Sequence, residues 1–109
     1  MTEPPAEGSL ELGSAPLRDY FAARLPERLR QIEDAWTEVR ATGWSAGAAH
    51  NFHRLVHSLS GAGSTFGFPA VSEAARRLER LLKPVVQGTA TPPADETVGE
   101  LLAGIRRSG

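Results

Sequence analysis

Apolar residues recur every three or four positions along most of the chain after residue 16, which is the spacing of one face of an α-helix. Four such stripes follow one another, and each pair of neighbouring stripes is separated by a short segment that contains glycine. The stripes are Leu17, Phe21, Leu25, Leu29, Ile32, Trp36 and Val39; Phe52, Leu55, Val56, Leu59, Gly63 and Phe66; Val71, Ala74, Ala75, Leu78, Leu81, Leu82 and Val85; and Val98, Leu101, Leu102 and Ile105. No segment shows the sustained alternation of a β-strand. Because four amphipathic helices with short loops must bury their stripes against one another, we expect an all-α fold, an up-down antiparallel four-helix bundle.

A proline interrupts the first stripe. Inside a helix, Pro26 removes a backbone hydrogen bond and clashes with the preceding turn, at a cost of about 3 kcal/mol. The pattern therefore predicts a short extra N-terminal helix near residues 17–24 and a long helix near 26–41. A single kinked helix is the alternative.

The other helix boundaries carry recognisable signals. We expect Gly43 to end the first long helix and Ser45 to cap the N-terminus of the second. Gly67 is a stop signal, and Pro69 suits the first turn of the third helix. The segment from Thr91 to Glu96 resembles the start of a fourth helix, with a cap at Thr91, two prolines and two first-turn acids.

Composition divides the chain into a tail and one domain. Residues 1–14 are rich in proline, glycine, serine and glutamate, and we expect them to form a flexible N-terminal tail. Residues 15–109 suffice for a single domain with a modest core.

Charge and residue usage exclude several classes of function. The net charge is −1, so no overall field favours nucleic acid or an anionic membrane as a partner. Cysteine is absent, which excludes disulfides, thiolate catalysis and cysteine-bound metal. No apolar run approaches the roughly 20 residues of a membrane span, and the acidic N-terminus lacks the features of a signal peptide. We therefore expect a cytoplasmic protein without a membrane or nucleic-acid partner.

His57 stands opposite the apolar stripe of its helix. With about 100° of rotation per residue, it falls among polar and small residues one or two turns away. These neighbours are His50, His53, Ser60, Gly61 and Ser64. A neutral imidazole in water, ringed by small residues, suits a nucleophile that another protein must reach.

Two glycines in this helix differ in their expected purpose. Gly61 faces solvent one turn beyond His57, where packing gives no reason for it. We expect it to keep the space beside His57 open. Gly63 faces the core, and we expect it to let another helix approach closely.

The run from His57 to Gly67 resembles the phosphoacceptor motif of histidine phosphotransfer (HPt) domains, which reads roughly H-x-L-K-G, two small residues, two variable positions, an aromatic or aliphatic residue and glycine. The similarity spans most of residues 17–86. It implies that His57 is the catalytic phosphoacceptor and that a partner docks over it, touching His53, Ser60, Gly61 and Ser64. Ser60 replaces the lysine of the family pattern, so a positive charge is missing there. Candidate substitutes are Arg54, Arg76, Arg77 and Arg80.

The resemblance also implies the partners. The chain has no glycine-rich phosphate loop and no following lysine, so it cannot charge His57 from ATP by itself. In the family, a response-regulator receiver domain supplies the aspartate and the magnesium, and a sensor histidine kinase is the other possible donor. We therefore expect a monomeric phosphorelay intermediate without a cofactor of its own.

Two other interpretations remain open from the sequence. One is a non-catalytic module that docks a receiver without phosphoryl transfer, which the missing lysine favours. The other is a metal-binding bundle, because His50, His53 and His57 share a helix face. No His-Glu-x-x-His arrangement and no fourth ligand are evident, so we expect no metal site.

Overall fold

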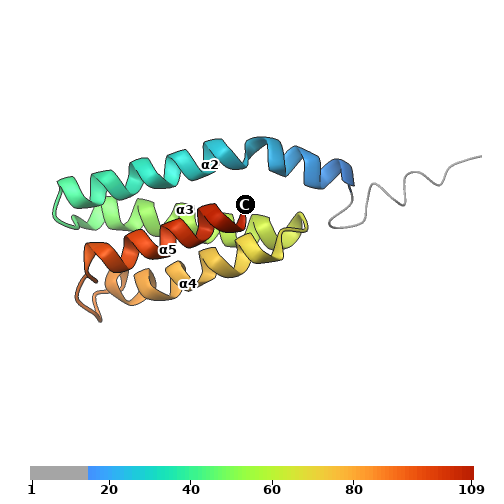
Figure 1. Ribbon diagram of the computed structural model, residues 1–109. Helices are drawn as coiled ribbons and strands as arrows, with labels where there is room; N and C mark the ends of the chain where they lie inside the picture. Colours follow the sequence, from blue (N-terminus) through green and yellow to red (C-terminus); the bar gives the residue numbers. More distant parts are fainter. Residues whose placement is uncertain (1–14) are drawn as a thin grey trace, which may run out of the picture.

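The computed structural model describes residues 15–109 and contains four α-helices and no strand in that part of the chain. The helices are α2 (Ala15–Ala41), α3 (Ala46–Thr65), α4 (Pro69–Val86) and α5 (Asp95–Ser108). They lie side by side, and each helix runs opposite to the one before it (Figure 1). The all-α prediction is confirmed. The predicted flexible tail, residues 1–14, lies outside the described residues.

The core is built from the predicted stripes. Each of the four helices contributes fully buried apolar side chains to one cluster. Two stacked aromatic pairs hold α2 against α3: Trp36 packs on Phe52, with ring centroids 5.5 Å apart, and Phe21 packs on Phe66, the C-cap residue of α3, at 5.6 Å. Such pairs add directional contact to the area they bury. The apolar faces of α2 and α3 are thereby fixed, and so is the outward direction of the opposite face of α3.

The predicted break at Pro26 is wrong. A single helix runs from Ala15 to Ala41 with Pro26 inside it, so residues 17–24 do not form a separate short helix. Pro26 and Ala22, whose carbonyl loses its hydrogen bond, both lie on the exposed side of α2. Buried residues flank the proline on the opposite side, Phe21 and Leu25 among them. Packing along that side offsets the local cost of the proline.

The predicted boundaries of α3 and the start of α4 are confirmed. The Ser45 side chain accepts a hydrogen bond from the backbone N–H of Ala48, at 3.4 Å, and so caps α3. Gly67, with φ +86°, follows the end of α3, and Pro69 begins α4. A backbone with φ in this range favours glycine because a Cβ would crowd the following carbonyl.

The last helix has the predicted first-turn acids but not the predicted cap. Helix α5 begins at Asp95, with Ala94 as N-cap and no side-chain cap hydrogen bond, so Thr91 is not the capping residue. Asp95 and Glu96 occupy the first turn, where acidic side chains interact favourably with the helix dipole. An ion pair between Asp95 and Arg40 of α2, at 3.5 Å, also holds this end.

Gly63 allows α3 and α4 to approach closely, as predicted. A Cβ at this position would lie 3.0 Å from the backbone nitrogen of Ser72 and 3.2 Å from the carbonyl oxygen of Phe68. These atoms belong to backbone, which cannot move aside as a side chain can. The close approach brings one side of α4 against α3 near His57.

Candidate functional site

His57 lies in the middle of α3 on its outward side. Its side chain is 68% exposed, whereas the adjacent Val56 is fully buried. The geometry therefore agrees with the predicted helix face. Because Val56 and Leu59 fix the inner face of α3, the position of His57 relative to the bundle is also fixed.

Glu79 of α4 holds the imidazole of His57. The distance between His57 Nδ1 and Glu79 Oε2 is 2.5 Å, and only 17% of the Glu79 side chain is exposed. An ionised carboxylate accepts hydrogen bonds and donates none, so the shared proton belongs to Nδ1. This tautomer leaves the lone pair on Nε2, which is then the nucleophilic atom of the ring.

Sequence reasoning missed the role of Glu79. A signal was present, because Glu79 continues the spacing of Ser72, Ala75 and Leu82, which are buried residues of α4. A carboxylate on an inward-facing stripe needs a partner, since burying an unpaired charge is costly. Nothing in the sequence alone says that this partner is His57, twenty-two positions earlier.

His53 completes the cluster one turn before His57. Its ring lies 6.2 Å from the His57 ring, centroid to centroid, with 23° between the planes. Its Nε2 is 3.8 Å from Glu79 Oε2, too far for a hydrogen bond, and this buried nitrogen has no partner within residues 15–109. Burial lowers the pKa of His53 below its ordinary value, although the nearby Glu79 carboxylate acts in the opposite direction.

The structure corrects the location of Ser60. We predicted it on the exposed face beside His57, but only 4% of it is exposed. Its hydroxyl donates to the His57 carbonyl at 3.0 Å and lies 3.5 Å from Glu79 Oε1. From α4, the Ser72 hydroxyl donates to the Ser60 carbonyl at 2.7 Å. The reason is the close approach at Gly63, which places Ser72 over Ser60.

Gly61 and Ser64 do lie on the exposed side of α3. A Cβ added to Gly61 would meet no atom within 4 Å, so packing does not require glycine there. The surface on this side of His57 is therefore formed by residues with small side chains.

The predicted substitute cations have other partners. The Arg54 guanidinium donates to Asn51 at 2.7 Å. Those of Arg77 and Arg80 lie 3.7 Å and 3.4 Å from Glu73. Arg76 differs from the other three arginines because it also contacts the region of Ser60. It pairs with Glu73 and donates to the Ser72 hydroxyl at 3.3 Å. This hydroxyl links Arg76 to the backbone of Ser60.

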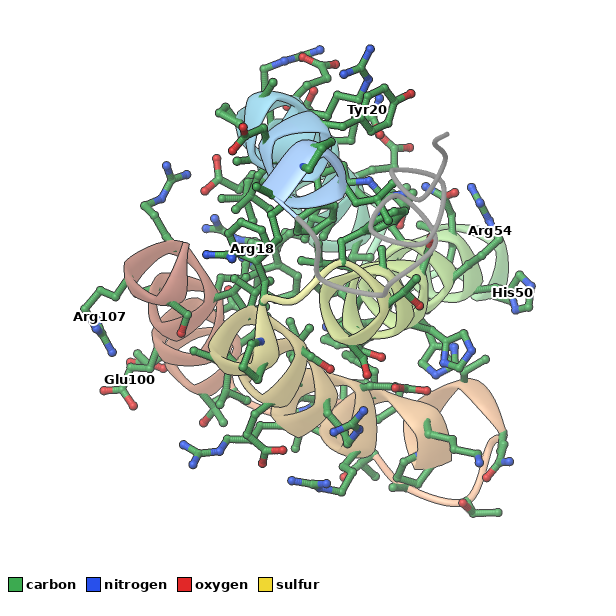
Figure 2. The ribbon with its side chains drawn as sticks, turned by 90° about the vertical axis from the view of Figure 1, so that its right-hand side faces the viewer. Arg18, Tyr20, His50, Arg54, Glu100 and Arg107 are labelled. Carbon is green, nitrogen blue, oxygen red and sulfur yellow. The ribbon has the colours of Figure 1, made fainter. Side chains whose placement is uncertain are left out.

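Other features bear on the remaining expectations. Within residues 15–109, no group of three or more histidine, aspartate or glutamate side chains is placed to hold a metal ion. Figure 2 shows His50 and Arg54 pointing outward from α3, on the opposite side of the molecule from Glu100 and Arg107 of α5. None of the described helices combines the length and apolar character needed to cross a membrane.

Comparison with known families agrees with the motif. The family model described as the Hpt domain matches residues 16–108, so the chain belongs to the Hpt domain family. Domains of this family interact with receiver domains and histidine kinases in phosphorelays. No curated protein and no solved structure gives a significant match to the chain.

Proposed function

We propose that this protein is a phosphorelay intermediate in which His57 accepts a phosphoryl group and passes it to or from a receiver-domain aspartate. The observation that carries this proposal is the pairing of an exposed His57 with a nearly buried Glu79, at 2.5 Å, in an Hpt domain. The pairing selects the tautomer in which Nε2 is free to attack. The four helices form an up-down bundle that holds this pair in place.

The geometry supports a simple transfer step. The lone pair of His57 Nε2 attacks the phosphorus of an aspartyl phosphate, the N–P bond forms, the P–O bond breaks, and the aspartate leaves as a carboxylate. The imidazole gains positive charge as the bond forms. The Glu79 carboxylate, which accepts the Nδ1 proton in a hydrogen bond, stabilises that charge. Transfer in the other direction reverses these steps.

The partner docks over the exposed side of α3. We place His53, Gly61 and Ser64 at the contact surface around His57, with Gly61 leaving room for the partner. Ser60 acts from beneath this surface, through its contact with the His57 carbonyl and its proximity to Glu79. The partner is a response-regulator receiver domain or a sensor histidine kinase, and the chain acts as a monomer in the cytoplasm.

One observation favours a second candidate, a docking module without transfer. Ser60 replaces the family lysine and is buried, so it brings no positive charge to a phosphoryl group on His57. A phosphohistidine formed here would depend on other cations for charge neutralisation.

Phosphoryl transfer from purified receiver domains distinguishes the two candidates. We expect radioactive phosphate from a phosphorylated cognate receiver to appear on the wild-type protein in a form that is stable in alkali and lost in acid. His57→Gln should abolish the label and leave the helical circular dichroism unchanged. His50→Gln is the matched control and should be labelled like the wild type. Stable receiver binding without any label would favour the docking module.

A further inference from the structure

His53 and His57 face the same carboxylate oxygen. Glu79 Oε2 lies 2.5 Å from His57 Nδ1 and 3.8 Å from His53 Nε2. The two histidines are one helical turn apart on α3, and Glu79 reaches both from α4. A movement of about 1 Å would bring the carboxylate within hydrogen-bond distance of His53.

The unpaired nitrogen of His53 gives this movement a driving force. Its Nε2 is buried and has no hydrogen-bond partner in the described part of the chain. A buried polar atom without a partner is unfavourable, because it has lost its hydrogen bonds to water. Glu79 relieves that cost when it turns from His57 to a protonated His53, because the Nε2–H then donates to the carboxylate and the pair carries opposite charges.

We propose that His53 is a positioning residue that competes with His57 for Glu79, so that the charge on His53 controls how firmly His57 is held for transfer. The proposal rests on the proposed function of His57. A neutral His53 leaves the carboxylate on His57 Nδ1 and keeps Nε2 as the nucleophile. A cationic His53 draws the carboxylate away, and the tautomer and orientation of His57 are no longer fixed.

Four groups act on the protonation of His53. The Glu79 carboxylate on α4 favours the cation, whereas His57 and His50 on α3 and Lys83 on α4 oppose it. Burial is the largest influence and lowers the pKa of His53, so the ring is neutral near neutral pH. The resting site is therefore the arrangement in which His57 holds Glu79.

The first experiment measures the competition without a receiver. NMR titration of the imidazole nitrogens measures the proton-binding constant of His53. We expect His57→Ala to increase this constant roughly three- to tenfold, because Glu79 is then free to pair with His53. The effect should vanish when Glu79→Gln is added. An unchanged His53 titration in His57→Ala, or an equal change in both backgrounds, would show that the histidines do not share the carboxylate.

The second experiment places a permanent cation at position 53. Phosphoramidate, used as a small phosphoryl donor, transfers its phosphoryl group to imidazole as its P–N bond breaks and ammonia leaves. Near neutral pH, we expect His53→Lys to be labelled at His57 roughly three- to tenfold more slowly than His53→Gln. NMR should show loss of the Nδ1-protonated tautomer of His57 in the lysine variant only.

His50→Lys is the matched control, because it adds the same charge to the outward side of α3, away from the core (Figure 2). Equal slowing in His50→Lys, or equal labelling of the two position-53 variants, would overturn the proposal. Should His53→Lys fail to fold, the titration series still decides the question. Neither measurement needs a receiver, so a negative result counts against the role of His53 alone. The proposed function fails on a different result, namely that no receiver transfers its phosphoryl group to His57.

Discussion

The contact between α3 and α4 has an apolar edge and a polar edge, and the same two helices build both. On the apolar edge, Val56 and Leu59 of α3 and Leu78 and Leu82 of α4 belong to one buried cluster, and each is at most 1% exposed. On the polar edge, His57 meets Glu79 through one short hydrogen bond. The adjacent residues Leu78 and Glu79 thus lie on different edges. The comparison indicates that a stability function and a chemical function can be separated by a single step along a helix.

Close packing explains why the edges differ in tolerance. On the apolar side, the helices are in contact along their length, and a change of one methyl group is felt. On the polar side, the donor is mostly exposed, and the contact depends on one proton and one carboxylate oxygen. Substitutions should therefore divide into those that affect unfolding and those that affect transfer.

Leu78→Ala should give the largest effect on stability. It removes a fully buried side chain from the core, and such truncations cost about 2–5 kcal/mol because the cavity collapses only in part. Chemical denaturation followed by circular dichroism measures this loss. Transfer to His57, corrected for the folded fraction, should remain close to that of the wild type. A strong loss of transfer by the folded Leu78→Ala protein would show that the two edges are not independent.

Gly61 and Gly63 of α3 test the same difference between an open side and a packed side of the helix. Gly63→Ala should lose about 1–3 kcal/mol, because its Cβ would press on the backbone of Ser72 and Phe68. Gly61→Ala should be neutral or stabilising by up to about 1 kcal/mol, because the position is open and alanine favours a helix. Denaturation of both variants under one set of conditions provides the comparison. Equal losses would contradict the assignment of Gly61 to the open side.

Glu79→Ala should affect transfer far more than folding. Loss of the carboxylate frees the His57 ring and its tautomer, and we expect phosphorylation by a cognate receiver to slow by roughly tenfold. The free energy of unfolding should change by only about 1 kcal/mol, because the contact is a single hydrogen bond whose donor is mostly exposed. Initial transfer rates and denaturation midpoints measure the two quantities. A Glu79→Ala variant with a much lower denaturation midpoint but a normal transfer rate would contradict the assignment of Glu79 to the chemical edge.

Acid should reveal a smaller effect through His53. Burial lowers the pKa of His53 in the folded protein, whereas in the unfolded chain the imidazole returns to about 6.5. The unfolded state therefore binds more protons between these two values. This contribution to stability is complete above about pH 6.5 and is lost as the pH falls toward the lowered pKa.

Denaturation near neutral pH and at about pH 5.5 should thus show a larger acid loss in the wild type than in His53→Gln. His50→Gln should keep most of the acid loss of the wild type, because burial, the largest influence on His53, is unchanged. Identical losses in all three proteins would show that His53 protonation is not coupled to folding.

Much of this site could be predicted from the sequence, because helical spacing fixes which residues share a face. The four apolar stripes predict the helices and most of the core. The position of His57 opposite Val56 and Leu59 follows from the same spacing, as do the open side at Gly61 and the close approach at Gly63. Each of these properties depends on the local geometry of one helix, which the chain itself encodes.

Tertiary packing decided the rest. Pro26 stays inside α2 because buried side chains on the opposite side of the helix offset the lost hydrogen bond and the steric clash of the proline. The sequence of this helix alone predicts only that cost. Ser60 is buried because α4 covers a position that a single helical wheel leaves on the open side. The pairing of Glu79 with His57 joins residues from two helices, and it depends on the distance and rotation between those helices. Periodicity within one helix contains no information about either quantity, so the acid that orients the phosphoacceptor becomes visible only when α3 and α4 are packed together.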